Sequence, residues 1–134
     1  MRLAAIDIGL KRIGTAISLD ENIVFPQDAI LRKNRNQAAK DVDSFLKQWE
    51  IKKLIVGIPK EGTSSEEMQR RIEHFVSLLE YDGTIEYMDE YGSSYEAKEQ
   101  SKGVFRHKKD GKIDSLAAKI VLERYIFAKS TKNS

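Results

Sequence analysis

The chain has 134 residues, of which 40% are hydrophobic and 33% charged, a composition typical of a folded protein rather than a disordered or membrane-spanning one. Cysteine is absent, which excludes disulfides, thiolate zinc sites and a cysteine nucleophile, so we expect any metal to be bound by oxygen. The formal net charge of +2 does not by itself indicate a nucleic-acid partner.

The length predicts a single domain over residues 1–134, with a tail that frays over about 129–134. No apolar run could span a bilayer, and the chain begins with a strand-like segment in place of a secretory signal. We therefore expect a cytoplasmic protein without a membrane partner.

The first part of the chain predicts an antiparallel meander followed by a helix. Apolar runs at Leu3–Ile8 and Ile13–Leu19 indicate two strands joined by a turn. A third strand begins at Ile23–Phe25, where Pro26 should interrupt it or restrict it to the sheet edge. From Asn36 to Glu50 apolar residues recur at helical spacing, which predicts an amphipathic helix.

The second part of the chain predicts alternating strands and helices. In order these are a strand at Leu54–Ile58, a helix after Ser64, a strand at Thr84–Met88, a short helix from Ser93 to about Gln100 and a helix from Ile113 to about Ala128. Ser64 with Glu67, and Ser93 with Glu96, fit capping boxes. Such alternation implies parallel strands, so the predicted fold class is α/β, with a mixed five-stranded sheet flanked by helices.

Asp7 is the most informative single residue. It lies in an otherwise apolar strand, where a carboxylate must be paired, hydrogen-bonded or bound to metal, although hydrogen bonds from the Gly9 turn could also satisfy it. Asp7 begins a D-x-G-x-x-x-x-G pattern in which Gly9 permits a tight turn and Gly14 lets another backbone or a phosphate approach. Lys11 and Arg12 at the hairpin tip could neutralise phosphates.

The same pattern occurs in two kinds of phosphate-handling protein. Ribonuclease H-like nucleases use the aspartate for metal, whereas actin-like and sugar kinases use the hairpin to hold a nucleoside triphosphate. The length of the chain disfavours the kinase alternative, because that architecture needs a second lobe to enclose the nucleotide.

Further carboxylates follow on later elements. Asp89 and Glu90 come directly after a strand, where an open α/β sheet presents ligand groups, and we expect one of the two to enter the site. Asp114 heads the apolar stripe formed by Ala117 and Val121, so it should face the core. Each could instead be an ordinary polar strand end or helix start.

Three carboxylates on separate elements suit Mg²⁺ or Mn²⁺ and phosphodiester hydrolysis. The candidate nucleic-acid contacts are Lys11, Arg12, Arg106, Lys108, Lys109 and Lys112, four of which lie in the basic segment 102–112. A second basic run contains Arg32, Lys33 and Arg35, and charge runs of this kind are more often solvated surface.

Four segments give the chain a resemblance to the YqgF/RuvX family of ribonuclease H-like nucleases. They are AIDIGLKRIGTAIS at 5–18, LIVGIPKEGTSS at 54–65, MDE at 88–90 and GKIDSLAAKIVLE at 111–123. The resemblance implies a ribonuclease H-like fold, with Asp7 and Asp114 as metal-site carboxylates and Glu90 as their acidic partner. It also implies a role in maturation of the 16S ribosomal RNA precursor, with cleavage of Holliday junctions as the alternative.

One departure from the family pattern bears on activity. The family commonly has an arginine after its D-E pair, followed by a hydrophobic residue and two hydroxyl residues, whereas this chain has Tyr91, Gly92, Ser93 and Ser94. The leading hypothesis is therefore a metal-dependent nuclease acting on structured RNA, with a DNA-junction resolvase second and a non-catalytic RNA-binding scaffold third.

Overall fold

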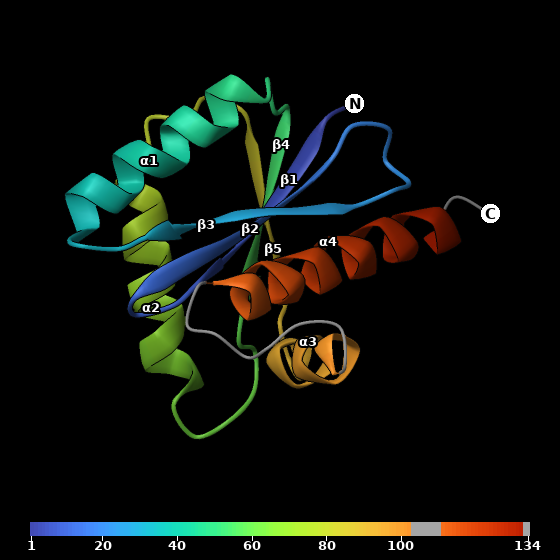
Figure 1. Cartoon of the computed structure of the whole chain (residues 1–134). Helices are drawn as coiled ribbons and strands as arrows, with labels where there is room; N and C mark the ends of the chain where they lie inside the picture. The colour runs from blue at the N-terminus through green and yellow to red at the C-terminus, as the bar shows by residue number, and fades with distance from the viewer. Residues whose placement is uncertain (103–110, 133–134) are drawn as a thin grey trace.

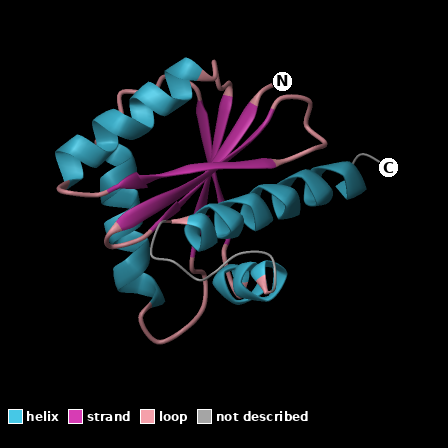
Figure 2. Ribbon diagram, in the orientation of Figure 1, coloured by secondary structure: helices cyan, strands magenta, loops and turns pink. Residues whose placement is uncertain are grey.

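The computed structural model describes residues 1–102 and 111–132, and these form a five-stranded sheet between two layers of helices (Figures 1 and 2). The strands are β1 (Leu3–Ile8), β2 (Arg12–Ser18), β3 (Phe25–Leu31), β4 (Lys53–Ile58) and β5 (Thr84–Asp89), in the spatial order β3-β2-β1-β4-β5. β1 pairs antiparallel with β2 and parallel with β4. β2 also pairs antiparallel with β3, and β4 pairs parallel with β5. The predicted meander, parallel half and α/β class are confirmed.

The central strand β1 divides its side chains between the two faces of the sheet, because neighbouring residues of a strand point opposite ways. Ala4, Ile6 and Ile8 pack with α1 (Arg35–Gln48) and α2 (Ser65–Ser77). Leu3 and Ala5 pack on the other face, against α4 (Lys112–Lys132). The alternation therefore directs Asp7 toward the face covered by α4, beside which α3 (Ser93–Ser101) lies (Figure 1).

β3 lies at the edge of the sheet, as Pro26 predicted. Pro26 stands opposite Ala16 of β2 and lacks an N–H, which is tolerated where one side of a strand has no partner. The strand begins at Phe25 and continues to Leu31, so it starts later than Ile23 and is not ended by the proline.

The first turn of α4 packs directly on the backbone of β2. A Cβ atom added to Gly14 would lie 1.9 Å from the carbonyl oxygen of Asp114, so only glycine permits this approach. The pairing of β2 with β3 is irregular between Ile13 and Thr15, and the Thr15 N–H donates instead to Ser115 Oγ at 3.2 Å. Gly14 therefore admits another backbone, which was one of the two alternatives its position suggested.

The helix starts differ from the predicted capping boxes. Ser64 makes no side-chain capping bond, because its backbone (φ −110°, ψ 13°) is not in the extended conformation that a cap requires. α3 is preceded by Gly92 at φ 71°, and Ser93 is its first helical residue. A complete capping box occurs instead at Asn34, at the start of α1.

α4 continues to Lys132, beyond Ala128 where the pattern predicted its end. In its last turns the Lys129 ammonium lies 5.6 Å from the centre of the Tyr125 ring, and the Ser130 hydroxyl donates to the Phe127 carbonyl. None of the described helices combines the length and apolarity needed to cross a membrane.

We predict that Gly14→Ala lowers the free energy of unfolding by about 3 kcal/mol, because the added methyl group would meet the backbone of α4. Gly92→Ala is the matched control: it has open space but a positive φ, so it should cost about 1–2 kcal/mol. Urea unfolding of both variants compares the two costs. Equal losses would contradict the close approach of α4 to β2.

Candidate active site

An open pocket lies at the carboxyl end of β1 and β5, and all three predicted carboxylates line it. Asp7 comes from β1, Glu90 follows β5 and Asp114 comes from the first turn of α4. Asp7 is paired in register with Gly14, where α4 approaches β2, so the helix brings Asp114 beside the end of β1. This pairing gives the D-x-G-x-x-x-x-G spacing a structural reason: it sets the aspartate opposite the glycine that admits the helix.

Asp7 and Glu90 interact directly. Burial raises the pKa of the Asp7 carboxyl well above its usual value, and a hydrogen bond with Glu90 and the negative charges of Glu90 and Asp114 raise it further. Glu90 is held in place because its N–H donates to the Ile58 carbonyl at 3.1 Å and because Gly57 leaves room for its side chain. Two carboxyl groups this close need a proton or a cation between them.

Asp89 also lines the pocket, so both residues of the D-E pair border it. Their surroundings differ. The Asp89 carboxylate accepts a hydrogen bond from the Tyr91 N–H at 3.1 Å and stabilises the turn into α3. Glu90, in contrast, meets Asp7, which makes it the better candidate for a shared ligand.

Asp114 lies beside a cation. Burial raises the pKa of the Asp114 carboxyl, while the positive charge of Arg12 opposes that shift. One guanidinium nitrogen of Arg12 lies 3.8 Å from Asp114 Oδ2, so the hairpin residue expected to contact phosphate also contacts a candidate metal ligand.

The other predicted basic contacts are exposed or lie outside the described residues. Lys11 is exposed on the turn between β1 and β2, and Lys112 is exposed at the start of α4. Arg106, Lys108 and Lys109 lie outside the described residues. Tyr91, at the position where the family resemblance predicts arginine, lines the pocket and is 79% exposed.

Sequence reasoning missed Glu61 and Tyr95, which also line the pocket. Glu61 lies just beyond the end of β4, and the carboxyl ends of parallel strands meet at one sheet edge, which is the signal that could have identified it. Tyr95 lies on the short helix α3, and its sequence surroundings carry no such signal.

The oxygen atoms of these carboxylates, and the distances between them, decide which metal ion the pocket suits. Among the described residues, no three Asp, Glu, His or Cys side chains are close enough to form a ready-made metal cage. Mg²⁺ does not require one, because it keeps several waters and is usually bound by one or two carboxylates together with substrate phosphates. The Asp7–Glu90 pair with Asp114 nearby fits an ion of this kind.

Comparison with known proteins gives a family and a fold. The model of the RuvX family, described as Holliday junction resolvase, matches residues 1–128. A Sulfurovum protein named "Putative pre-16S rRNA nuclease" is 73% identical over 126 residues, covering 94% of this chain and 98% of that protein. A protein of the same name from Campylobacter jejuni subsp. doylei is 58% identical over 125 residues, with 93% and 96% covered.

Two solved structures have the same fold at low sequence identity. Thermus thermophilus RuvC, in complex with a Holliday junction substrate, has a TM-score of 0.59 at 11% identity, with 97% of this chain and 96% of that one covered. The fowlpox virus Holliday junction resolvase has a TM-score of 0.56 at 16% identity, with 96% and 99% covered. The fold is thus that of RuvC-like resolvases, which confirms the predicted ribonuclease H-like class.

We predict that Asp7→Asn stabilises the protein in the presence of a chelator at alkaline pH. Because the pKa of Asp7 is raised in the folded state, the unfolded chain loses this proton first, and stability falls as pH rises from about 3.8 through the raised pKa. Asparagine does not ionise. The gain in stability over the parent should therefore be largest above the raised pKa of Asp7 and should vanish toward pH 3.8. Thermal unfolding across pH measures it.

Asp20→Ala provides a control of opposite sign. Hydrogen bonds from the N–H groups of Asn22 and Ile23 lower the pKa of the Asp20 carboxyl, so its contribution is present at neutral pH and is lost as pH falls through the lowered pKa. The alanine variant should therefore be less stable than the parent at neutral pH. An Asp7→Asn variant that is also less stable at pH 8 would contradict the repulsion among the pocket carboxylates.

Proposed function

Since this chain belongs to the RuvX family, we propose that it is a nuclease that hydrolyses phosphodiester bonds of nucleic acid with the help of Mg²⁺ or Mn²⁺. The observation that carries the proposal is the meeting of Asp7 and Glu90 at the end of β1, with Asp114 in the same pocket. These oxygen donors suit hard divalent cations, and the repulsion between them gives a cation a reason to bind.

In this proposal Asp7 and Glu90 would hold the metal, together with Asp114 from the same pocket. When bound, the metal supplies an activated water and neutralises charge on the scissile phosphate. The carboxylate side chains would orient a water by accepting its hydrogen bonds. Arg12 balances part of the negative charge at Asp114 before substrate arrives.

The basic residues near the carboxylates would hold the substrate by its phosphates. Of those that the structure describes, Arg12 is the best placed, because its guanidinium lies 3.8 Å from the Asp114 carboxylate. Lys11 and Lys112, both exposed, would extend the contact along the strand. For Arg106, Lys108 and Lys109 the same role is proposed from their basic sequence alone.

The proposed substrate is the precursor of 16S ribosomal RNA, which the names of the relatives at 73% and 58% identity support. Since ribosomal RNA is processed where ribosomes assemble, we expect the protein to act in the cytoplasm. A four-way DNA junction is the alternative substrate, favoured by the description of the family model. Cleavage of matched precursor RNA and junction DNA by metal-loaded protein separates the two, and cleavage of neither would favour the RNA-binding scaffold.

We predict that Glu90→Gln reduces single-turnover cleavage more than about 100-fold, because losing even a residue behind a metal ligand costs about 10–100-fold. Asp89→Asn is its matched control: the asparagine oxygen can still accept the Tyr91 N–H, so this variant should keep most of the parent rate. The reverse ranking of the two variants would assign the metal to Asp89.

Metal removal should stop cleavage and leave the fold intact, since apolar side chains pack on both faces of the sheet. We expect Mg²⁺ or Mn²⁺ to restore activity after treatment with a chelator, measured by cleavage of labelled RNA alongside circular dichroism. Undiminished cleavage in excess chelator would refute a metal-dependent mechanism.

A further inference from the structure

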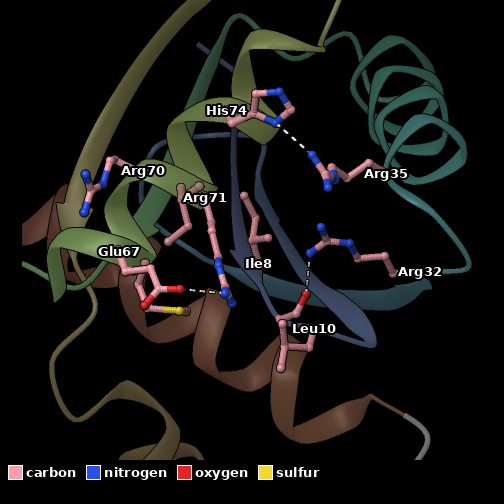
Figure 3. A pocket seen from close by; sticks show the side chains of 11 residues that line it. Ile8, Leu10, Arg32, Arg35, Glu67, Arg70, Arg71 and His74 are labelled. Carbon is pink, nitrogen blue, oxygen red and sulfur yellow. Dashed lines mark hydrogen bonds and ion pairs between the residues drawn. The ribbon is translucent and has the colours of Figure 1, made fainter. Parts of the chain in front are cut away.

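A second cavity, of about 500 Å³, lies on the face of the sheet that α1 and α2 cover (Figure 3). Both cavities are lined by Ile8 and Gly9, the last residue of β1 and the residue after it. Asp7 and Ile8 point to opposite faces, so the strand end separates the carboxylate pocket from the second cavity. A volume of this size lies within the range of small-molecule binding sites.

The second cavity is strongly basic. Arg32 from the segment after β3, Arg35 from α1 and Arg71 from α2 surround Ile8, whereas Arg70 extends from the other side of α2 in this view (Figure 3). Among the described residues that line the cavity, Glu67 alone is acidic, and it pairs with Arg71 at 2.7 Å. The three arginines that surround Ile8, against one glutamate, leave an excess of positive charge for an anion to neutralise.

Each of these arginine side chains is oriented by only a few contacts, so most of its own N–H donors can reach a ligand. One Arg32 nitrogen donates to the Gly9 carbonyl at 2.9 Å, and its guanidinium lies 5.5 Å from the centre of the Phe75 ring. Arg35 contacts His74 Nδ1 at 3.4 Å. Since a guanidinium has five N–H donors, such contacts orient the group and leave several donors for a ligand.

The floor and rim of this cavity are apolar. Ile8 and Ile72 are buried beneath the arginines, Met68 is partly buried, and Leu10 on the turn after β1 is 75% exposed. A free inorganic anion would contact only the arginine side chains and leave the apolar residues uncovered. A nucleotide would also cover the apolar residues with its sugar and base, so the combination favours a nucleotide over a simple ion.

We propose that this cavity binds one nucleotide of the substrate, its phosphate held by Arg32, Arg35 and Arg71, while a neighbouring part of the strand reaches the carboxylates on the other face. The strand would then cross the turn at Gly9 and Leu10, which joins the two cavities. This inference rests on the proposed nuclease function and adds a path for the substrate. The phosphate is either an internal phosphodiester or a terminal phosphate, and the two share the same recognition chemistry.

The test measures binding of fluorescent RNA oligonucleotides by the Asp7→Asn protein, which does not cut if the proposed function is right. Added R35Q and R71Q substitutions, both at exposed positions, should weaken binding about 10-fold at 0.1 M salt and reduce the salt slope by about 1. K40Q with K47Q removes the same charge from the exposed face of α1 away from both cavities and is the matched control. Thermal unfolding verifies that all variants are folded.

A second measurement identifies the phosphate. The loss of affinity caused by R35Q and R71Q is measured for oligonucleotides with and without a 5′-phosphate. A difference assigns a terminal phosphate and equal values assign an internal one, and both results support the site. In ¹⁵N-labelled protein, the signals of Arg32, Arg35 and Arg71 should shift on adding adenosine monophosphate.

Two results would overturn the proposal: an unchanged affinity and salt slope in the arginine variant, or an equal loss in the lysine control. Neither readout requires cleavage. A protein that binds through the arginines without cutting would therefore refute the nuclease and keep this binding site, and one that cuts without using the arginines would do the reverse.

Discussion

The approach of α4 to Gly14 is the constraint on which the site depends. Asp114 lies a hundred residues after Gly14 in the sequence, and the two backbones touch because residue 14 has no side chain. Since Gly14 is paired in register with Asp7, the same contact that docks the helix also brings the two carboxylates to one pocket. The hydrogen bond from the Thr15 N–H to Ser115 then fixes the helix along its axis. Packing and site geometry are thus consequences of one close contact.

The end of β1 separates two regions of opposite charge. Carboxylates from three segments line one pocket on the α4 face, and arginines from three segments surround Ile8 on the face covered by α1 and α2. The separation follows from the alternation of a strand, which sends Asp7 and Ile8 in opposite directions. Each region suits one part of a nucleic-acid strand: the acidic one a metal ion at a phosphate, the basic one a phosphate directly.

Much of the fold could be predicted from the sequence because the signals are local. The apolar runs marked the strands, Pro26 marked the sheet edge, and Asp7 stood out as a carboxylate in an apolar strand. The capping boxes predicted at Ser64 and Ser93 were wrong, because Ser64 does not have the extended backbone of a cap and because Ser93 is already the first helical residue after Gly92. The arginine cavity was missed because its members come from separate elements, and a basic run such as Arg32 to Arg35 is usually solvated surface.

Tyr91 bears on where this chain obtains its positive charge. An arginine directly after Glu90 would place a cation at the end of β5, beside the carboxylates. Among the residues that the structure describes, Arg12 from β2 supplies a cation beside a candidate ligand, because it lies 3.8 Å from Asp114 on the adjoining α4. Phosphate contacts at the carboxylates would then come from the hairpin side of the pocket, the side on which Gly9 and Leu10 lead to the arginine cavity. The substitution at Tyr91 and the cluster around Ile8 are consistent with one arrangement, in which the hairpin rather than the end of β5 guides the strand.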